Sequence, residues 1–218
     1  MQTKTLAAFI AVPLLASGML TGAATAQEAA PAAATATAAL DVPSGTYVLD
    51  PTHASVTWKV NHMGLSHYTA RFTRFDATLN LDAAKPENST ISVTIDPKSV
   101  RTDYPFPEKE DFDAKIAGKD FFDADQFPEI RFTSTKVERL GTDSGKVHGN
   151  LTFHGVTKPI TMDVKLVGAK QHPMLNVGAV GFSATTRFKR SEFGVDSLVP
   201  MVGDEVTVQI EAEFVEKK

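Results

Sequence analysis

The amino-acid sequence predicts an all-β domain with one short helix, in which an antiparallel sheet closes into a barrel or a sandwich. Apolar and polar residues alternate with a period of two along most of the chain after residue 44, which is typical of strands with one wet and one dry face. Turn signals such as Lys85–Asn88 and Asp143–Gly145 separate these segments. Few segments have a helical pattern, so the dry face must be buried by closing the sheet on itself or on a second sheet.

The N-terminus has the three parts of a secretory signal. Lys4 precedes an apolar run from Leu6 to Leu20, and small residues follow as far as Ala24–Ala26. An uncleaved membrane anchor is the alternative, but a proline and a glycine interrupt the run, which is shorter than the roughly 20 apolar residues of a spanning helix. We therefore expect residues 1–26 to be a signal peptide that is cleaved after Ala26.

The segment 27–43 is rich in Ala and Thr and lacks the large apolar side chains that could compensate for the entropy lost on ordering. We predict that it is a flexible linker. Residues 44–218 then form one domain, since β-barrels of this length commonly fold as a single unit.

The predicted strands follow in chain order, and each has apolar residues at every second position. In the last of them, Val206, Val208 and Ile210 alternate with Thr207 and Gln209. The alternation is clearest in segments 54–60, 76–82, 91–95, 130–132, 147–153, 160–166, 180–184 and 206–214.

One segment, Glu108–Phe122, breaks the alternation and predicts a helix of two or three turns. It is rich in Glu, Lys, Asp and Ala, and Phe112 and Ile116 lie four residues apart, on one helical face. We expect this face to pack on the barrel, followed by Phe121 and Phe122 in a loop or short turn.

Composition excludes several classes of function. The formal net charge is -4 and the charges are spread along the chain, which disfavours a nucleic-acid partner or an anionic lipid surface. The sequence contains no cysteine, so it has no disulfide, no thiolate nucleophile and no lipid-modified cysteine.

No set of residues predicts catalysis or metal binding. The six histidines include His62 and His67 in a predicted hairpin, but they form neither an H-E-x-x-H motif nor a Cys/His cluster. A G-x-S-x-G nucleophile motif is absent, as are a P-loop and a dinucleotide-binding motif. We expect no catalytic residue, no metal and no cofactor.

The chain has 14 Phe against three Tyr and one Trp, and many of these rings fall on the dry faces. Two interpretations remain open from composition alone. The rings fill an ordinary core, or they line a tunnel for an elongated apolar guest, because a barrel of about eight strands is just wide enough for either.

Four segments, in the family's order, resemble the YceI-like family of exported lipid binders. They are Tyr47–His53, Asp120–Phe132, Gly149–Pro159 and Arg190–Val195. The resemblance implies an extended antiparallel lipocalin-like β-barrel in the periplasm. It also implies that a polyisoprenoid, an isoprenoid quinone or a similar amphiphile is held in the interior, with no chemical step, in a protein that often forms a homodimer. The expected partners are this lipid and a membrane that donates or accepts it.

The chain departs from the family pattern at two places close to its recognisable motifs. Family members often carry Arg-Asp and His where this chain has Phe112–Ile116, and Asn where it has Lys189. These departures leave the tunnel intact and concern the head-group contacts.

The predicted site has an apolar wall and a polar mouth. We expect His53, His62 and Arg190 to contact the head group, although Arg190 is equally suited to an ion pair that holds the last hairpin. An exported isomerase or hydrolase acting on the bound lipid is the alternative function. The predicted tail-binding residues are Val56, Trp58, Val60, Phe72, Phe75, Phe112, Phe121, Phe122, Phe132, Leu151, Phe153, Phe182, Phe188 and Phe193.

Overall fold

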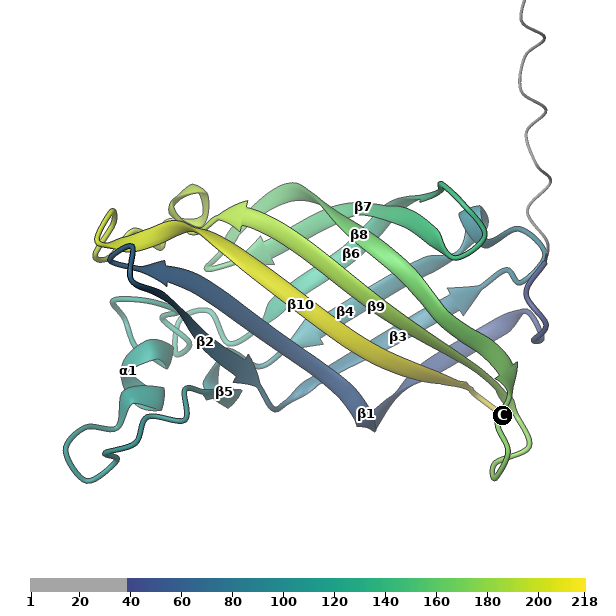
Figure 1. Cartoon of the computed structure of the whole chain (residues 1–218), viewed down its shortest axis with the longest axis horizontal. Helices are drawn as coiled ribbons and strands as arrows, with labels where there is room; N and C mark the ends of the chain where they lie inside the picture. Colours follow the sequence, from purple (N-terminus) through teal and green to yellow (C-terminus); the bar gives the residue numbers. More distant parts are fainter. Residues whose placement is uncertain (1–38) are drawn as a thin grey trace, which may run out of the picture. The chain divides into compact units, whose positions relative to one another are not determined.

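Strand β1 (Gly45–His62) closes the sheet, because it pairs with strands from both ends of the domain. Along one edge it pairs with β10 (Val202–Glu216), and along the other with β2 (Ser66–Phe72) and β3 (Phe75–Leu81). In the computed structural model, which describes residues 39–218, the sheet is therefore a closed antiparallel barrel (Figure 1). The predicted fold class is confirmed.

The remaining elements follow as a meander around the barrel. Neighbouring strands pair in the order β3, β4, β6, β7, β8, β9 and β10. Their bounds are η1 (Pro86–Asn88), β4 (Thr90–Ile95), η2 (Pro97–Ser99), β5 (Val100–Arg101), α1 (Phe112–Ala117), β6 (Ile130–Arg139), β7 (Ser144–Phe153), β8 (Val156–Gln171), β9 (Gly178–Lys189) and η3 (Arg190–Phe193).

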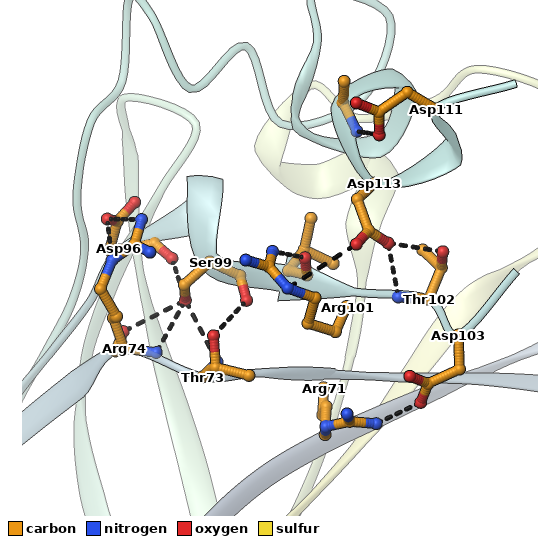
Figure 2. A network of polar contacts seen from close by, with 12 residues as sticks. Arg71, Thr73, Arg74, Asp96, Ser99, Arg101, Thr102, Asp103, Asp111 and Asp113 are labelled. Carbon is orange, nitrogen blue, oxygen red and sulfur yellow. Dashed lines mark hydrogen bonds and ion pairs between the residues drawn. The ribbon is translucent and has the colours of Figure 1, made fainter. Parts of the chain in front are cut away.

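Two of the barrel strands are each bent into two pieces, which are β2 with β3 and β4 with β5. Strands β2 and β3 both pair with β1, whereas β5 pairs with β2 and β4 pairs with β3. The bend between β2 and β3 lies at Thr73 and Arg74, whose backbone N–H groups both donate to the Ser99 hydroxyl (Figure 2). With each bent pair counted once, the barrel described by residues 39–218 has eight strands.

The register places the predicted dry faces on the inside. Phe132 lies opposite Leu151, and Ala184 lies between Val164 and Ile210 of its two neighbouring strands. These partners all line the interior. The period-two pattern therefore correctly predicted which side chains point inward, because successive residues of a strand face opposite sides of the sheet.

The helix is shorter than the predicted Glu108–Phe122. The Asp111 side chain accepts a hydrogen bond from Ala114 N at 3.0 Å and so caps α1 at its N-terminus, and the helix ends before Gly118. Its two predicted contacts are nonetheless present, since Ile116 is buried in the main core cluster and Phe112 packs against it.

The end of the predicted linker is attached to the barrel. Leu40 N donates to Ala83 O at 2.8 Å, and the Tyr47 hydroxyl donates to Pro43 O at 2.7 Å. The predicted signal peptide and the rest of the linker lie outside the described residues. In the described part of the chain, none of the helices has the length and hydropathy required to cross a bilayer.

Candidate functional site

The inward faces of the strands enclose a cavity of about 490 Å³. Its wall is almost entirely apolar, and every barrel strand contributes to it. Several inward-facing side chains, among them Ile160, Val164 and Ile210, are only partly buried although no strand lies between them and the barrel axis. Their partial exposure shows that the opposing faces do not meet. The volume is in the usual range of small-molecule binding sites, about 300–1,000 Å³.

Thirteen of the fourteen predicted tail-binding residues line this cavity, and Phe193 does not. The Phe193 ring is buried behind the wall, with centroids 5.3 Å from Phe188 and 5.8 Å from Phe153. Other lining residues were not among those predicted. Each follows the same inward parity, which was the signal that could have found them: Leu79, Ile91, Val93, Ile160, Met162, Val164, Leu166, Ala184, Val208, Ile210 and Phe214.

An aromatic cluster forms the wall of the cavity near α1. Phe122 is its centre, with ring centroids 6.1 Å from Trp58, 5.7 Å from Phe72 and 5.6 Å from Phe153. Phe112 extends the cluster through an edge contact with Tyr68 at 6.0 Å. Because Phe112 and Phe122 come from α1 and the turn that follows it, this segment forms part of the cavity wall.

Polar contacts hold α1 against the barrel (Figure 2). The Asp113 carboxylate accepts hydrogen bonds from Thr102 N at 2.7 Å and from the Thr102 hydroxyl at 2.6 Å, and lies 3.8 Å from Arg101 Nε. Because Thr102 is buried, its hydroxyl and amide need hydrogen-bond partners within the protein, and this carboxylate accepts from both. The pair thereby fixes the position of Phe112 in the wall.

Trp58 contributes a polar atom to the apolar wall. Its indole Nε1 is buried and has no hydrogen-bond partner among the described residues. An unpaired buried donor costs roughly 1–3 kcal/mol. Trp58 is the only Trp in the sequence, so its fluorescence reports on the environment of the cavity.

The two ends of the cavity differ in polarity. Near the β1–β2 turn, His62, Leu198 and Val202 line it. At the β6–β7 turn, by contrast, the lining includes charged residues of both signs, Glu138, Arg139, Asp143 and Lys146. Arg139 donates to the carbonyl oxygens of Gly141 and Thr142, and Lys146 Nζ lies 2.5 Å from Asp163 Oδ1. The alternation of residues along the sequence did not predict this polar end.

The three predicted head-group residues lie in different surroundings. His62 and Arg190 line the cavity, whereas His53 is exposed and is not among the lining residues. Arg190 is buried, and its guanidinium donates to Gly203 O at 2.9 Å, Val195 O at 3.0 Å and Val202 O at 2.9 Å. Burial lowers the pKa of Arg190.

His53 belongs to a polar turn within β1. Its Nδ1 lies 2.9 Å from Asp50 Oδ2, and the other Asp50 oxygen accepts from the Thr52 amide and hydroxyl. Side-chain atoms of Asp50, His53 and Glu213, of the kind that bind metal ions, lie within 4.8 Å of one another at the surface. Hydrogen bonds from Thr52 and His53 lower the pKa of Asp50 to about 2, and the bond to Asp50 raises the pKa of His53.

We predict that the pKa of His53, measured by NMR titration, lies above 6.5 and falls toward 6.5 in Asp50→Asn. The Asp50–His53 pair contributes to stability fully between pH 3.8 and 6.5. Its contribution is lost as pH rises through the raised pKa of His53, and also as pH falls through the lowered pKa of Asp50. A pKa that is the same in both proteins would show that the pair is open in solution.

Comparison with known proteins identifies relatives of the whole domain. The YceI-like domain model matches residues 47–214. A UPF0312 protein of Shewanella sp. (strain W3-18-1) is 36% identical over 173 residues, covering 78% of this chain and 87% of the relative. A UPF0312 protein of Pseudomonas fluorescens (strain SBW25) is 36% identical over 166 residues, covering 76% and 83%.

Solved structures show the same fold. The YCEI protein of Campylobacter jejuni superposes with a TM-score of 0.65 at 30% identity, covering 73% of this chain and 91% of that one. A polyisoprenoid binding domain from Saccharophagus degradans has a TM-score of 0.57 at 13% identity, covering 78% and 98%. By the extent of the domain match and the identity to its relatives, the chain belongs to the YceI-like domain family.

Proposed function

We propose that this protein is a periplasmic binding or carrier protein for a long-chain apolar lipid. The lipid is a polyisoprenoid or an amphiphile similar to an isoprenoid quinone, held in the barrel interior. The observation that carries the proposal is the apolar cavity of about 490 Å³, which lies where a filled barrel would have a packed core. The polyisoprenoid binding domain of Saccharophagus degradans, which shares the fold, supports this class of ligand.

The energetics favour a long tail over a small ligand. Each CH₂ group removed from water stabilises the complex by about 0.8 kcal/mol, so ten buried carbons contribute roughly 8 kcal/mol. Association costs an estimated 4–15 kcal/mol in lost translational and rotational freedom. A short chain would therefore bind weakly, whereas a chain that follows the length of the cavity can bind well.

The head-group contacts belong to the same proposal. The polar end at the β6–β7 turn, lined by the acidic residues Glu138 and Asp143 as well as by Arg139 and Lys146, suits a polar head group better than the apolar end does. His62 and Arg190 remain candidates because they also line the cavity. His53 lies on the outer surface, where it pairs with Asp50 of the same strand.

The alternative, an enzyme acting on the bound lipid, needs polar groups that converge on one point of the cavity. Within residues 39–218, His62 lines the cavity and His53 does not, so these two polar residues do not share a site. The carrier is therefore the better-supported function.

Native mass spectrometry of protein purified without detergent tests the proposal. We expect a population heavier than the polypeptide by the mass of one lipid, which organic extraction removes. The extract then identifies the lipid by its fragmentation. A polypeptide that carries no added mass in repeated preparations, and that takes up no polyprenyl alcohol or quinone when these are added, would contradict the carrier.

A further inference from the structure

Two loops lie side by side at one end of the barrel. One is the β1–β2 turn, residues 62–66, and the other leads from η3 into β10, residues 195–202 (Figure 1). Met63 N donates to Met201 O at 2.9 Å, and His62 lies opposite Val202 in the register. The two loops therefore form one continuous surface.

This surface carries five large apolar side chains that are each more than one third exposed. We call them the apolar rim: Met63, Leu65, Leu198, Val199 and Met201. Residues 62–67 and 197–203 contain no Asp, Glu, Lys or Arg. Single exposed apolar side chains are ordinary, but a contiguous uncharged group of five commonly marks an interaction site.

The apolar rim is continuous with the wall of the cavity. Leu198 belongs to both, and His62 and Val202, which flank the rim, also line the cavity. The aromatic cluster around Phe122 lies behind this end, and the charged lining at the β6–β7 turn lies at the other. The apolar rim thus borders one side of the apolar mouth of the cavity.

We propose that the apolar rim docks the protein on a lipid bilayer, with the mouth of the cavity facing the membrane. This inference rests on the proposed function, because a carrier of a membrane lipid must load and unload at a bilayer. Asp196 is the one charged residue of the two loops and lies outside the uncharged stretches 62–67 and 197–203, and these stretches suit the acyl region, where a charged side chain would be costly.

The chemistry of the apolar rim also predicts how docking depends on lipid charge and on salt concentration. No Lys or Arg lies in the two loops, so attachment should come from apolar insertion rather than from attraction to anionic lipids. We therefore expect binding to vesicles of phosphatidylcholine alone, and little change in binding between low and high salt.

The test uses a pair of substitutions in the apolar rim and a matched pair elsewhere. Leu65 and Met201 are 84% and 55% exposed, and Met174 and Leu175, in the β8–β9 loop at the opposite end of the barrel, are 84% and 51% exposed. Leu65→Ser with Met201→Ser therefore removes as much exposed apolar surface as Met174→Ser with Leu175→Ser. All four side chains are solvent-exposed, so both variants should fold.

In vesicle flotation we expect the rim variant to bind phosphatidylcholine vesicles at least tenfold more weakly than the unaltered protein, since each lost apolar side chain is worth about tenfold in partitioning. The matched variant should bind as the unaltered protein does. Equal loss in both variants, or no vesicle binding by the unaltered protein, would overturn the proposal.

Two further measurements separate the other occupants of this surface. A dimer in sedimentation velocity that becomes a monomer in the rim variant, without vesicle binding, would assign the apolar rim to a second copy of the chain. Native mass spectrometry on the same samples separates docking from the carrier function. Protein that floats with vesicles but never holds a lipid would support the docking surface and contradict the carrier function. Protein that holds a lipid but never floats would support the carrier function and contradict the docking surface.

Discussion

Replacing Ala184 with Trp is expected to lower the lipid bound per protein at least tenfold. Ala184 lies in β9 between Val164 of β8 and Ile210 of β10, and all three line the cavity. An indole built at this position would project into the 490 Å³ space and obstruct the path of a tail. A tenfold loss corresponds to about 1.4 kcal/mol, less than the burial of two methylene groups. The measurement is lipid content by extraction and native mass spectrometry.

Thr185→Trp is the matched control. Thr185 is the next residue of β9 and lies opposite Gln209 and Asp163, so its side chain points to the outer face of the barrel. This variant should carry as much lipid as the unaltered protein. Both variants should retain the far-ultraviolet circular dichroism of an antiparallel barrel. An Ala184→Trp protein with native circular dichroism and a full lipid load would show that the lipid is held elsewhere.

Replacing Arg190 with Ala is expected to destabilise the lipid-free protein by about 3–5 kcal/mol. The guanidinium donates to three backbone carbonyls, those of Val195, Val202 and Gly203, and so connects η3 to the start of β10. Hydrogen bonds from a charged donor contribute roughly 1.5–3 kcal/mol each, and buried carbonyls that lose their donor pay a desolvation cost. Urea unfolding, followed by circular dichroism on delipidated protein, measures the change.

Lys189→Ala provides the control, because Lys189 is the exposed neighbour of Arg190 in sequence. Its stability should change by less than about 0.5 kcal/mol, as is usual for surface positions. The same experiment separates the two roles predicted for Arg190. A head-group ligand alone would lose lipid without loss of stability in the lipid-free state, whereas a structural arginine loses stability whether or not lipid is bound.

Local patterns predicted the strands well and the helix only in part. The alternation identified inward-facing residues such as Trp58 and Phe132, because the pleat of a strand directs side chains by position alone. The segment around α1 has no such rule. Asp111 and Asp113 lie in a segment rich in charged residues, where nothing local distinguishes them, yet Asp111 caps the helix and Asp113 accepts hydrogen bonds from a buried threonine. Both roles depend on partners that only the fold supplies.

The predicted head-group residues also depend on partners that are distant in the sequence. His53 and Arg190 were predicted to lie at a polar mouth, but the local sequence does not determine on which side of the sheet such a residue lies. His53 falls in a turn where β1 changes register against β10, so it lies outside the wall, while Arg190 is folded inward onto three carbonyls. The apolar rim joins loops more than 130 residues apart in the sequence and is visible only when the strands are paired.

The sequence by itself determined that this chain forms antiparallel strands with one dry face, that its wall is aromatic and apolar, and to which family it is similar. Only the tertiary structure decided that the dry faces surround an open volume instead of packing together. The physical reason is that cavity volume depends on strand number and register around the whole ring, including the pairing of β1 with β10. Such long-range geometry leaves no trace in the local alternation of residues.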